Sequence, residues 1–128
     1  MLNSIQIQGQ FTSTPELTTV NGVKLVQFTL ACDRSQRNRK GEKMTDFIPC
    51  IAWNKKAEFI ATYFKKGDVM LVSGRLQSRN YETQTGRRSV AYEVSVNDVF
   101  FCEGKKKRTD GIEDDYIDWD KIPDIEQN

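Results

Sequence analysis

The sequence predicts an all-β fold, a barrel of five strands with one helix between the third and fourth strands, followed by a charged tail. Three observations predict it. Apolar and polar residues alternate with the period of a strand in five segments, one segment of about ten residues has helical spacing, and the composition becomes strongly polar after residue 103. With 128 residues, of which 38% are apolar, the chain has the size of one domain.

The first two strands are predicted on either side of a turn. Residues 4–11 carry Ile, Gly or Phe at odd numbers and Ser or Gln at even numbers. Pro15 ends this segment because proline cannot donate a hydrogen bond to a sheet. Asn21-Gly22 favours a tight turn, and the second strand then follows at residues 23–34 with its apolar face on even numbers.

The third strand is predicted at residues 46–53, after a long polar and basic loop at residues 34–45. The strand is rich in aromatic and β-branched residues, and Pro49 within it favours an edge position or a bulge. The helix comes next, with Asn54 as a favourable N-cap. The apolar residues that follow have the spacing of one helix face: Ala57, Ile60, Ala61 and Phe64.

The last two strands form a predicted hairpin. Residues 69–81 place their even-numbered residues, up to Leu76, on the inward face, and residues 82–87 make the tip. The return strand at residues 88–101 changes the parity of its apolar residues, which predicts a bulge near Asn97-Asp98. Five strands with one helix between the third and fourth are typical of the OB-fold, a Greek-key barrel.

Charge divides the chain into two parts. Residues 1–109 carry 18 Lys/Arg against 10 Asp/Glu, a net charge of +8, whereas residues 110–128 carry one Lys against eight Asp/Glu, a net charge of −7. This asymmetry favours a body that binds a polyanion and an acidic tail. We expect one folded domain over residues 1–103, and a flexible, disordered tail over residues 104–128 that is first basic and then acidic.

The composition argues against several classes of function. The chain has no histidine, the commonest general base and metal ligand. Its three cysteines, Cys32, Cys50 and Cys102, have neither the spacing of a zinc site nor the even number of a disulfide framework. No apolar run has the length of a membrane span, and the first residues lack the pattern of a signal peptide. We therefore expect a cytoplasmic protein with no cofactor and no enzymatic activity.

Two features favour binding of a single-stranded nucleic acid, whose phosphates are negative and whose unpaired bases can stack. The fourth strand places Arg75, Arg79 and Tyr81 opposite to its core face, and the third strand has Phe47 and Trp53 on one parity. Core positions for Phe47 and Trp53 are an open alternative, because large aromatic residues are usually buried. Further cations flank this predicted face in three clusters: Arg34, Arg37, Arg39, Lys40 and Lys43 in the loop, Lys55 and Lys56 at the helix start, and Arg87 and Arg88 at the hairpin tip.

The order and spacing of several short motifs resemble the bacterial single-stranded DNA-binding proteins, including phage-borne versions. The resemblance covers about residues 1–102 and is carried by residues 2–9, 15–17, 21–22, 28–31, 46–53, 57–58, 63–67 and 74–81. It implies a homotetramer that binds and protects single-stranded DNA during replication, recombination and repair, without sequence preference. Three of the family's four stacking positions are matched, by Phe47, Trp53 and Tyr81. The fourth falls at Gln36, which offers hydrogen bonds but no π-face.

The tail also resembles the family in part. The family's tail ends in several acids, an apolar residue, Pro and a terminal Phe, and this tip binds replication and repair proteins. Here Ile and Pro follow the acids, but no Phe follows them. The resemblance therefore implies that contacts with such partners would involve the tail residues Asp114, Asp115, Asp118, Trp119, Asp120, Ile122 and Pro123.

Two other functions are compatible with the barrel. One is an OB-fold interaction module of a replication-restart (primosome) assembly, which meets DNA only within that assembly. The other is an OB-fold nuclease, which needs acids grouped around a metal ion, and the acids of the body lack such spacing. Quenching of Trp53 fluorescence by oligo-dT in the purified protein separates a DNA-binding protein from the interaction module.

Overall fold

The computed structural model describes residues 1–102. The expected tail, with its candidate partner-binding residues from Asp114 to Pro123, lies outside the described residues, so the domain boundary at residue 103 stays a prediction. Within the described part, one helix is present, and it lacks the length and apolar character needed to cross a membrane. The elements are β1 Ile5–Phe11, β2 Leu17–Val20, β3 Val23–Arg37, β4 Lys43–Trp53, α1 Asn54–Tyr63, β5 Val69–Glu82 and β6 Arg88–Phe101.

Five of the strands close into a barrel. β1 pairs antiparallel with β5 along its length and, at Gln10 and Phe11, with β3. The circuit continues from β5 to β6 and from β6 to β4, which run parallel, and β4 returns to β3. The helix α1 lies between the third and fourth strands of this circuit in chain order. The predicted OB-fold barrel is therefore confirmed.

The short strand β2 was not predicted from the sequence. All four of its residues are exposed, and it pairs only with the beginning of β3. Since neither of its faces meets the core, the sequence shows no alternation there. The predicted turn at Asn21-Gly22 joins β2 to β3, with φ values of 52° and 80° that such a tight hairpin turn requires.

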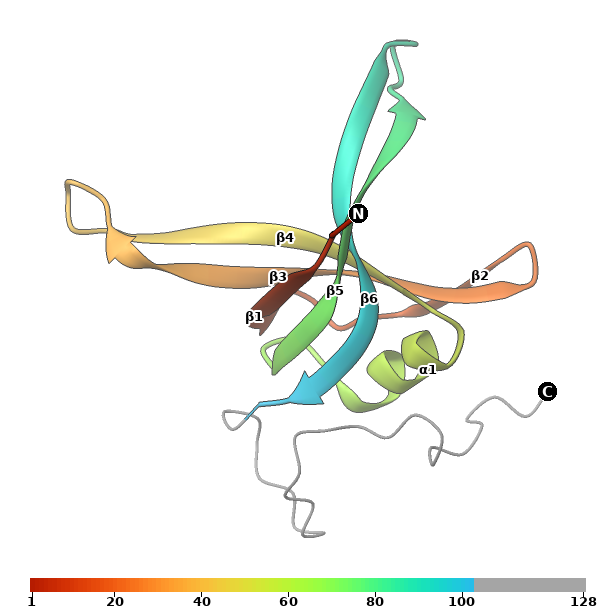
Figure 1. The fold of residues 1–128 in the computed structure, drawn as a ribbon, viewed down its shortest axis with the longest axis horizontal. Helices are drawn as coiled ribbons and strands as arrows, with labels where there is room; N and C mark the ends of the chain where they lie inside the picture. Colours follow the sequence, from red (N-terminus) through yellow and green to blue (C-terminus); the bar gives the residue numbers. More distant parts are fainter. Residues whose placement is uncertain (103–128) are drawn as a thin grey trace, which may run out of the picture.

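Two hairpins extend beyond the barrel as arms that point in different directions (Figure 1). In the β3–β4 arm only residues 38–42 lie between the strands. The predicted loop at 34–45 is thus wrong in its bounds, because cross-strand pairing continues as far as Arg37 and Lys43. In the β5–β6 arm, Leu76 was predicted to face the core but is 43% exposed, because the pairing of β5 with β1 ends at Gly74, before this position.

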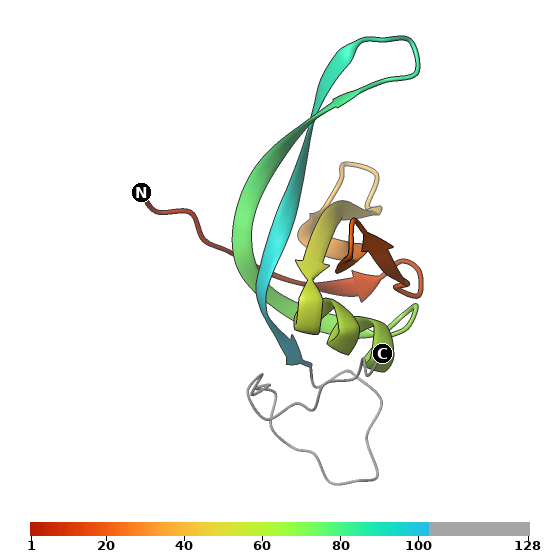
Figure 2. The same ribbon diagram turned by 90° about the vertical axis from the view of Figure 1, so that its right-hand side faces the viewer.

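The core fills the barrel and continues beneath α1, which lies at one end of it (Figures 1 and 2). Phe11 stacks on Phe28 and Phe64, with ring centroids 4.9 and 5.4 Å apart. From the helix, Ala57 and Ile60 are fully buried in the same cluster. The predicted stripe is thus confirmed at Ala57, Ile60 and Phe64, although Phe64 is the C-cap of the helix, Ala61 is half-buried, and the buried Phe59 was not predicted. α1 packs against the end of the barrel on the side away from the two arms (Figure 1).

The start of α1 differs from the prediction. Trp53 occupies the N-cap position in extended conformation, and no side chain caps the helix. Asn54, the predicted N-cap, is instead the first helical residue with φ of 57°. Asparagine tolerates this left-handed conformation better than most residues. Asn54 therefore makes the sharp turn that leads directly from β4 into α1.

The predicted bulge near Asn97-Asp98 is confirmed. In the β5–β6 register, Asn97 is the extra residue between the paired residues Val96 and Asp98. The extra residue restores the inward direction, so both Val96 and Val99 are buried in the core. Gly74 is required opposite the bulge, because a Cβ there would overlap a backbone oxygen of β6.

Candidate nucleic-acid interface

The strand register makes the outward face of β4 continuous with that of its neighbour β6. Phe47 and Trp53 lie six residues apart on β4, so both share a face with Ile51 between them. Ile51 lies beside Ser95 in the parallel pair of β4 and β6. The same face of the sheet therefore continues across β6.

The register then carries this face from β6 to β5. Ser95 lies opposite Arg75, and Tyr81 lies six residues further along β5 on the same side. The three predicted stacking residues, Phe47, Trp53 and Tyr81, thus lie on one continuous face of the sheet. We call this face the aromatic face. It carries Phe47, Trp53 and Tyr81 and is formed by the outward sides of β4, β6 and β5 and of β3, which pairs with β4.

All three aromatic side chains of this face are available to solvent. Phe47 is 64% exposed, Trp53 is 40% exposed and Tyr81 is 43% exposed. The alternative of core positions for Phe47 and Trp53 is therefore wrong. Exposed aromatic rings on a sheet can stack on the bases of a single strand.

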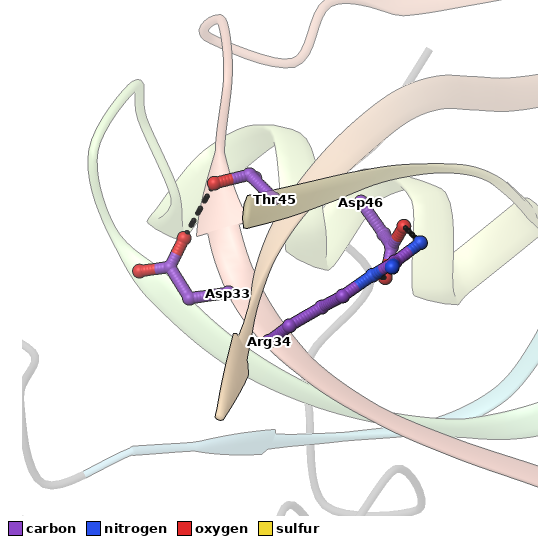
Figure 3. Close-up of polar contacts among 4 residues, drawn as sticks. All are labelled: Asp33, Arg34, Thr45 and Asp46. Carbon is purple, nitrogen blue, oxygen red and sulfur yellow. Dashed lines mark hydrogen bonds and ion pairs between the residues drawn. The ribbon is translucent and has the colours of Figure 1, made fainter. Parts of the chain in front are cut away.

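Arg34 does not lie with the aromatic residues. Its guanidinium donates to both carboxylate oxygens of Asp46, from Nε at 3.0 Å and from Nη2 at 2.9 Å (Figure 3). Asp46 directly precedes Phe47 in β4, so the two side chains point to opposite faces of the arm. Arg34 is therefore held by a carboxylate on the face away from Phe47.

Lys43 and Arg37 lie opposite each other on the aromatic face but are held within the β3–β4 arm. Lys43 Nζ is 3.3 Å from Asp33 Oδ2, and Asp33 Oδ1 accepts a hydrogen bond from Thr45 Oγ1 at 2.8 Å (Figure 3). Arg37 Nη1 donates to the carbonyl oxygen of Gly41 at 2.9 Å. These contacts order the end of the arm. They also neutralise part of its positive charge.

The remaining predicted cations surround the aromatic face unevenly. Lys55 and Lys56 follow Trp53 closely at the start of α1. Arg88 lies opposite Glu82, so its side chain points away from the aromatic face. The exposed cations that make no ion pair within residues 1–102 include Arg39 and Lys40 at the tip of the β3–β4 arm, Lys55, Arg75, and Arg87 in a shallow hollow at the tip of the β5–β6 arm.

A buried acid of this face, Glu93, was not singled out from the sequence. Gln77 Nε2 donates to Glu93 Oε2 at 2.8 Å, and Arg79 Nε lies 3.6 Å from the same oxygen. Counting pairs outward from the predicted tip at residues 82–87 places Gln77 opposite Tyr92, one residue away from its actual partner Glu93, because Glu82 pairs with Arg88 and belongs to the strand. Burial of the Glu93 side chain, which is 5% exposed, has no signal in the sequence.

The aromatic face offers stacking and ion pairing rather than reactive groups. Burial raises the pKa of the Cys50 thiol to about 12 and also raises that of Cys32. The nucleophilic thiolate is therefore scarce at neutral pH. In the part of the chain that the structure describes, no group of three or more Cys, Asp and Glu residues is placed to hold a metal ion.

Contacts within the β3–β4 arm lower the pKa values of Asp33 and Asp46. A hydrogen bond from Arg34 lowers the pKa of Asp46, and contacts from Thr45 and Lys43 lower that of Asp33. Each contact therefore stabilises the fold above the unfolded pKa of about 3.9. The contribution is lost as the pH falls through the lower pKa of the folded state.

We expect Asp46→Asn to lower the thermal unfolding midpoint slightly at pH 7, since an exposed ion pair contributes little. The difference between wild type and variant should shrink as the pH falls from about 3.9 through the lower pKa of folded Asp46, because the wild-type carboxylate then loses its charge. Circular dichroism melts across this range test the prediction, with Glu16→Gln, an exposed acid outside the arm, as control. A difference that stays constant down to acid pH would contradict it.

Comparison with known proteins gives the family. Residues 2–102 match the model of the single-strand binding protein family. The single-stranded DNA-binding protein A of Bacillus subtilis is 45% identical over 106 residues, which cover 82% of this chain and 62% of that protein. The single-stranded DNA-binding protein of Halalkalibacterium halodurans is 43% identical over 112 residues, which cover 87% of this chain and 67% of that protein. The chain thus spans between three fifths and about two thirds of the length of these relatives.

A solved structure supports the fold. The Plasmodium falciparum SSB in complex with ssDNA superposes with a TM-score of 0.70 at 24% sequence identity, covering 80% of this chain and 96% of that one. At this identity the likeness bears on the fold alone. The match to the family model over residues 2–102 shows that the chain belongs to the single-strand binding protein family.

Proposed function

We propose that this protein binds single-stranded DNA without sequence preference, and protects it during replication, recombination and repair without catalysing a reaction. The observation that carries the proposal is the aromatic face, on which Phe47, Trp53 and Tyr81 are all exposed. Every base has a π-face, so stacking on these rings is independent of sequence and contributes about 1–3 kcal/mol per base. The names of the bacterial relatives agree with this function.

Positive charge supplies the second part of the binding energy. Residues 1–102 carry 14 Lys/Arg against 9 Asp/Glu, a net charge of +5. Within residues 1–102, exposed cations without an ion pair lie in the connections at the ends of both arms and two residues after Trp53, so they flank the aromatic face. With roughly six phosphate contacts, the log–log salt slope of single-strand binding would be about −4.

A fluorescence titration with oligo-dT tests the proposal. The chain has two tryptophans, Trp53 and Trp119, so the titration uses Trp119→Phe to make Trp53 the only indole reporter. Stacking of a base on Trp53 should quench its emission in a saturable manner, with an affinity that falls steeply with salt. Binding without quenching would place DNA away from Trp53. Absence of binding would favour the replication-restart interaction module instead.

We also propose that the protein is a homotetramer, as the family resemblance implies. The reverse side of the β5–β6 arm supports self-association, because Leu76, Val90 and Tyr92 share that side and are 43%, 49% and 61% exposed. An exposed apolar patch of this kind is typical of a protein–protein contact. The patch lies opposite to the aromatic face, so assembly through it would leave Trp53 and Tyr81 accessible.

Tyr92→Asp is expected to reduce the solution mass of the protein from that of a tetramer to that of a smaller species, because a buried unpaired carboxylate opposes association. Sedimentation velocity over a range of concentrations measures this. Gln84→Asp, at the tip of the same arm and outside the patch, adds the same charge and should leave the mass unchanged. A wild type that sediments as a monomer would overturn the tetramer.

For the tail we propose contacts with basic surfaces of replication and repair proteins, and electrostatic competition with DNA. Deleting residues 110–128 removes a net charge of −7 and should tighten binding of oligo-dT at low salt. The gain should fade as salt shortens the Debye length from about 30 Å at 0.01 M to about 3 Å at 1 M. A tail of equal length with its acids replaced by Asn and Gln should behave like the deletion. Unchanged or weaker binding at low salt would contradict this role.

A further inference from the structure

We infer that Glu93 is a positioning residue, which holds Arg79 on the aromatic face in place to bind a DNA phosphate. This inference rests on the proposed function. The contacts that carry it are those of the Glu93 carboxylate with Arg79 and with Gln77. It assigns a binding role to a negatively charged residue on a face that binds a polyanion.

The burial of Glu93 is unusual for its place in the sheet. β6 lies between β5 and β4, and Glu93 is on the outward side of this middle strand, opposite Gln77. Its side chain is nevertheless 5% exposed, whereas that of Arg79 is 49% exposed. A buried carboxylate requires positive or hydrogen-bonding partners, and this one has both.

The geometry directs the charge of Arg79 outward. Arg79 Nε lies 3.6 Å from Glu93 Oε2, so the two side chains form an ion pair, while the Arg79 side chain stays 49% exposed. The residue directly opposite Arg79 is Ala91, whose small side chain leaves the guanidinium free to lean across to Glu93. Gln77 donates a hydrogen bond to the same oxygen at 2.8 Å and so helps to hold the carboxylate in place. Arg79 thus lies two residues from Tyr81 on the same face, and about half of its side chain remains open to solvent.

Anchoring of this kind lowers the entropy that Arg79 loses when it binds a phosphate. A free arginine side chain has many rotamers, and fixing them on binding reduces the affinity. The guanidinium has five N–H donors in a planar fork, so one edge can meet Glu93 while the other meets a phosphate.

A simpler electrostatic view predicts the opposite sign. A carboxylate near DNA repels the phosphates, so its neutralisation should tighten binding if Glu93 only stabilises the fold. In the positioning role, neutralisation should weaken binding although the protein becomes more positive. The sign of the effect therefore separates the two roles.

The experiment measures oligo-dT affinity by Trp53 quenching at several salt concentrations, in the Trp119→Phe protein with Glu93→Asp or Glu93→Gln. Glu93→Asp keeps the charge but shortens the reach, and Glu93→Gln keeps the reach but removes the charge. Both should weaken binding by about fivefold, through the lost ordering of Arg79. In an Arg79→Gln background neither should weaken it further, because the residue through which Glu93 acts is gone.

Glu82→Gln is the matched control, an exposed acid of the same hairpin whose side chain points to the reverse side. Its affinity should be unchanged or slightly higher. Circular dichroism melts show which variants are folded, and Glu93→Asp retains a testable protein if Glu93→Gln unfolds. Equal or tighter binding by a folded Glu93 variant, or an equal loss with and without Arg79, would overturn the inference. If the Trp119→Phe protein with Glu93 intact fails to bind or to quench, the proposed function fails instead.

Discussion

Replacing Trp53 and Tyr81 together by alanine is expected to weaken oligo-dT binding between about 30-fold and about 10⁴-fold, since each stacked base contributes about 1–3 kcal/mol. Both rings are exposed on the aromatic face, so their loss removes stacking without opening a core cavity. The double variant should therefore remain folded, with a thermal unfolding midpoint close to that of the wild type. Anisotropy of a fluorescently labelled oligo-dT measures the affinity, because the variant no longer carries the Trp53 reporter.

The salt dependence of the same variant separates stacking from phosphate contacts. Loss of the two rings should leave the log–log salt slope nearly unchanged, because the cations around the aromatic face are still present. Tyr63→Ala is the matched control: Tyr63 is 43% exposed, as Tyr81 is, but lies on α1 away from this face. Unchanged affinity in the double variant, or an equal loss in Tyr63→Ala, would show that DNA does not stack on Trp53 and Tyr81.

The barrel was predictable from the sequence because its strands are half-buried. Where one side of a strand meets the core, apolar and polar residues alternate along the sequence, as they do around Val72 and Val94. The parity change before Val99 even predicts the bulge at Asn97, since one extra residue must be absorbed for Val99 to reach the core. The alternation of apolar and polar residues thus predicted the strands wherever one of their sides is buried.

The arms and β2 were less predictable because burial does not constrain them. Leu76 and Tyr92 continue the apolar parity of their strands beyond the barrel, so the sequence alone cannot show that they are exposed. Likewise, the polar residues 34–45 resemble a loop, although the strands continue to Arg37 and from Lys43, and these two residues pair with each other. In these segments strand pairing, rather than a buried side, determines the structure.

The candidate site was predictable in composition but not in arrangement. The sequence identified the aromatic residues and the cations, and the cross-strand register placed Phe47, Trp53 and Tyr81 on one face. It could not show that Arg34 is held by Asp46 on the reverse face, which depends on which strand neighbours meet. The local ion pairs are thus a property of the tertiary structure.

Gln36→Trp is expected to tighten oligo-dT binding by about 5-fold to 150-fold, because it would add a platform worth about 1–3 kcal/mol. Gln36 is exposed near the end of β3, in the irregular part of its register with β4 between Asp33 and Arg37. A side chain there has no core contacts to disturb, so the fold should tolerate the larger ring. Anisotropy titrations with oligo-dT of increasing length measure both the affinity and the length of strand that is bound.

Gln36→Leu distinguishes stacking from a general gain of apolar surface. Leucine adds apolar area at the same position but has no π-face, so it should bind DNA nearly as the wild type does. If tryptophan and leucine give equal affinities, the β3–β4 arm does not contact bases near residue 36, and the strand is held by the other three aromatic residues. A gain for tryptophan alone would mean that the DNA path extends along this arm. An aromatic residue at position 36 would then give the same fold a higher affinity for DNA than Gln36 does.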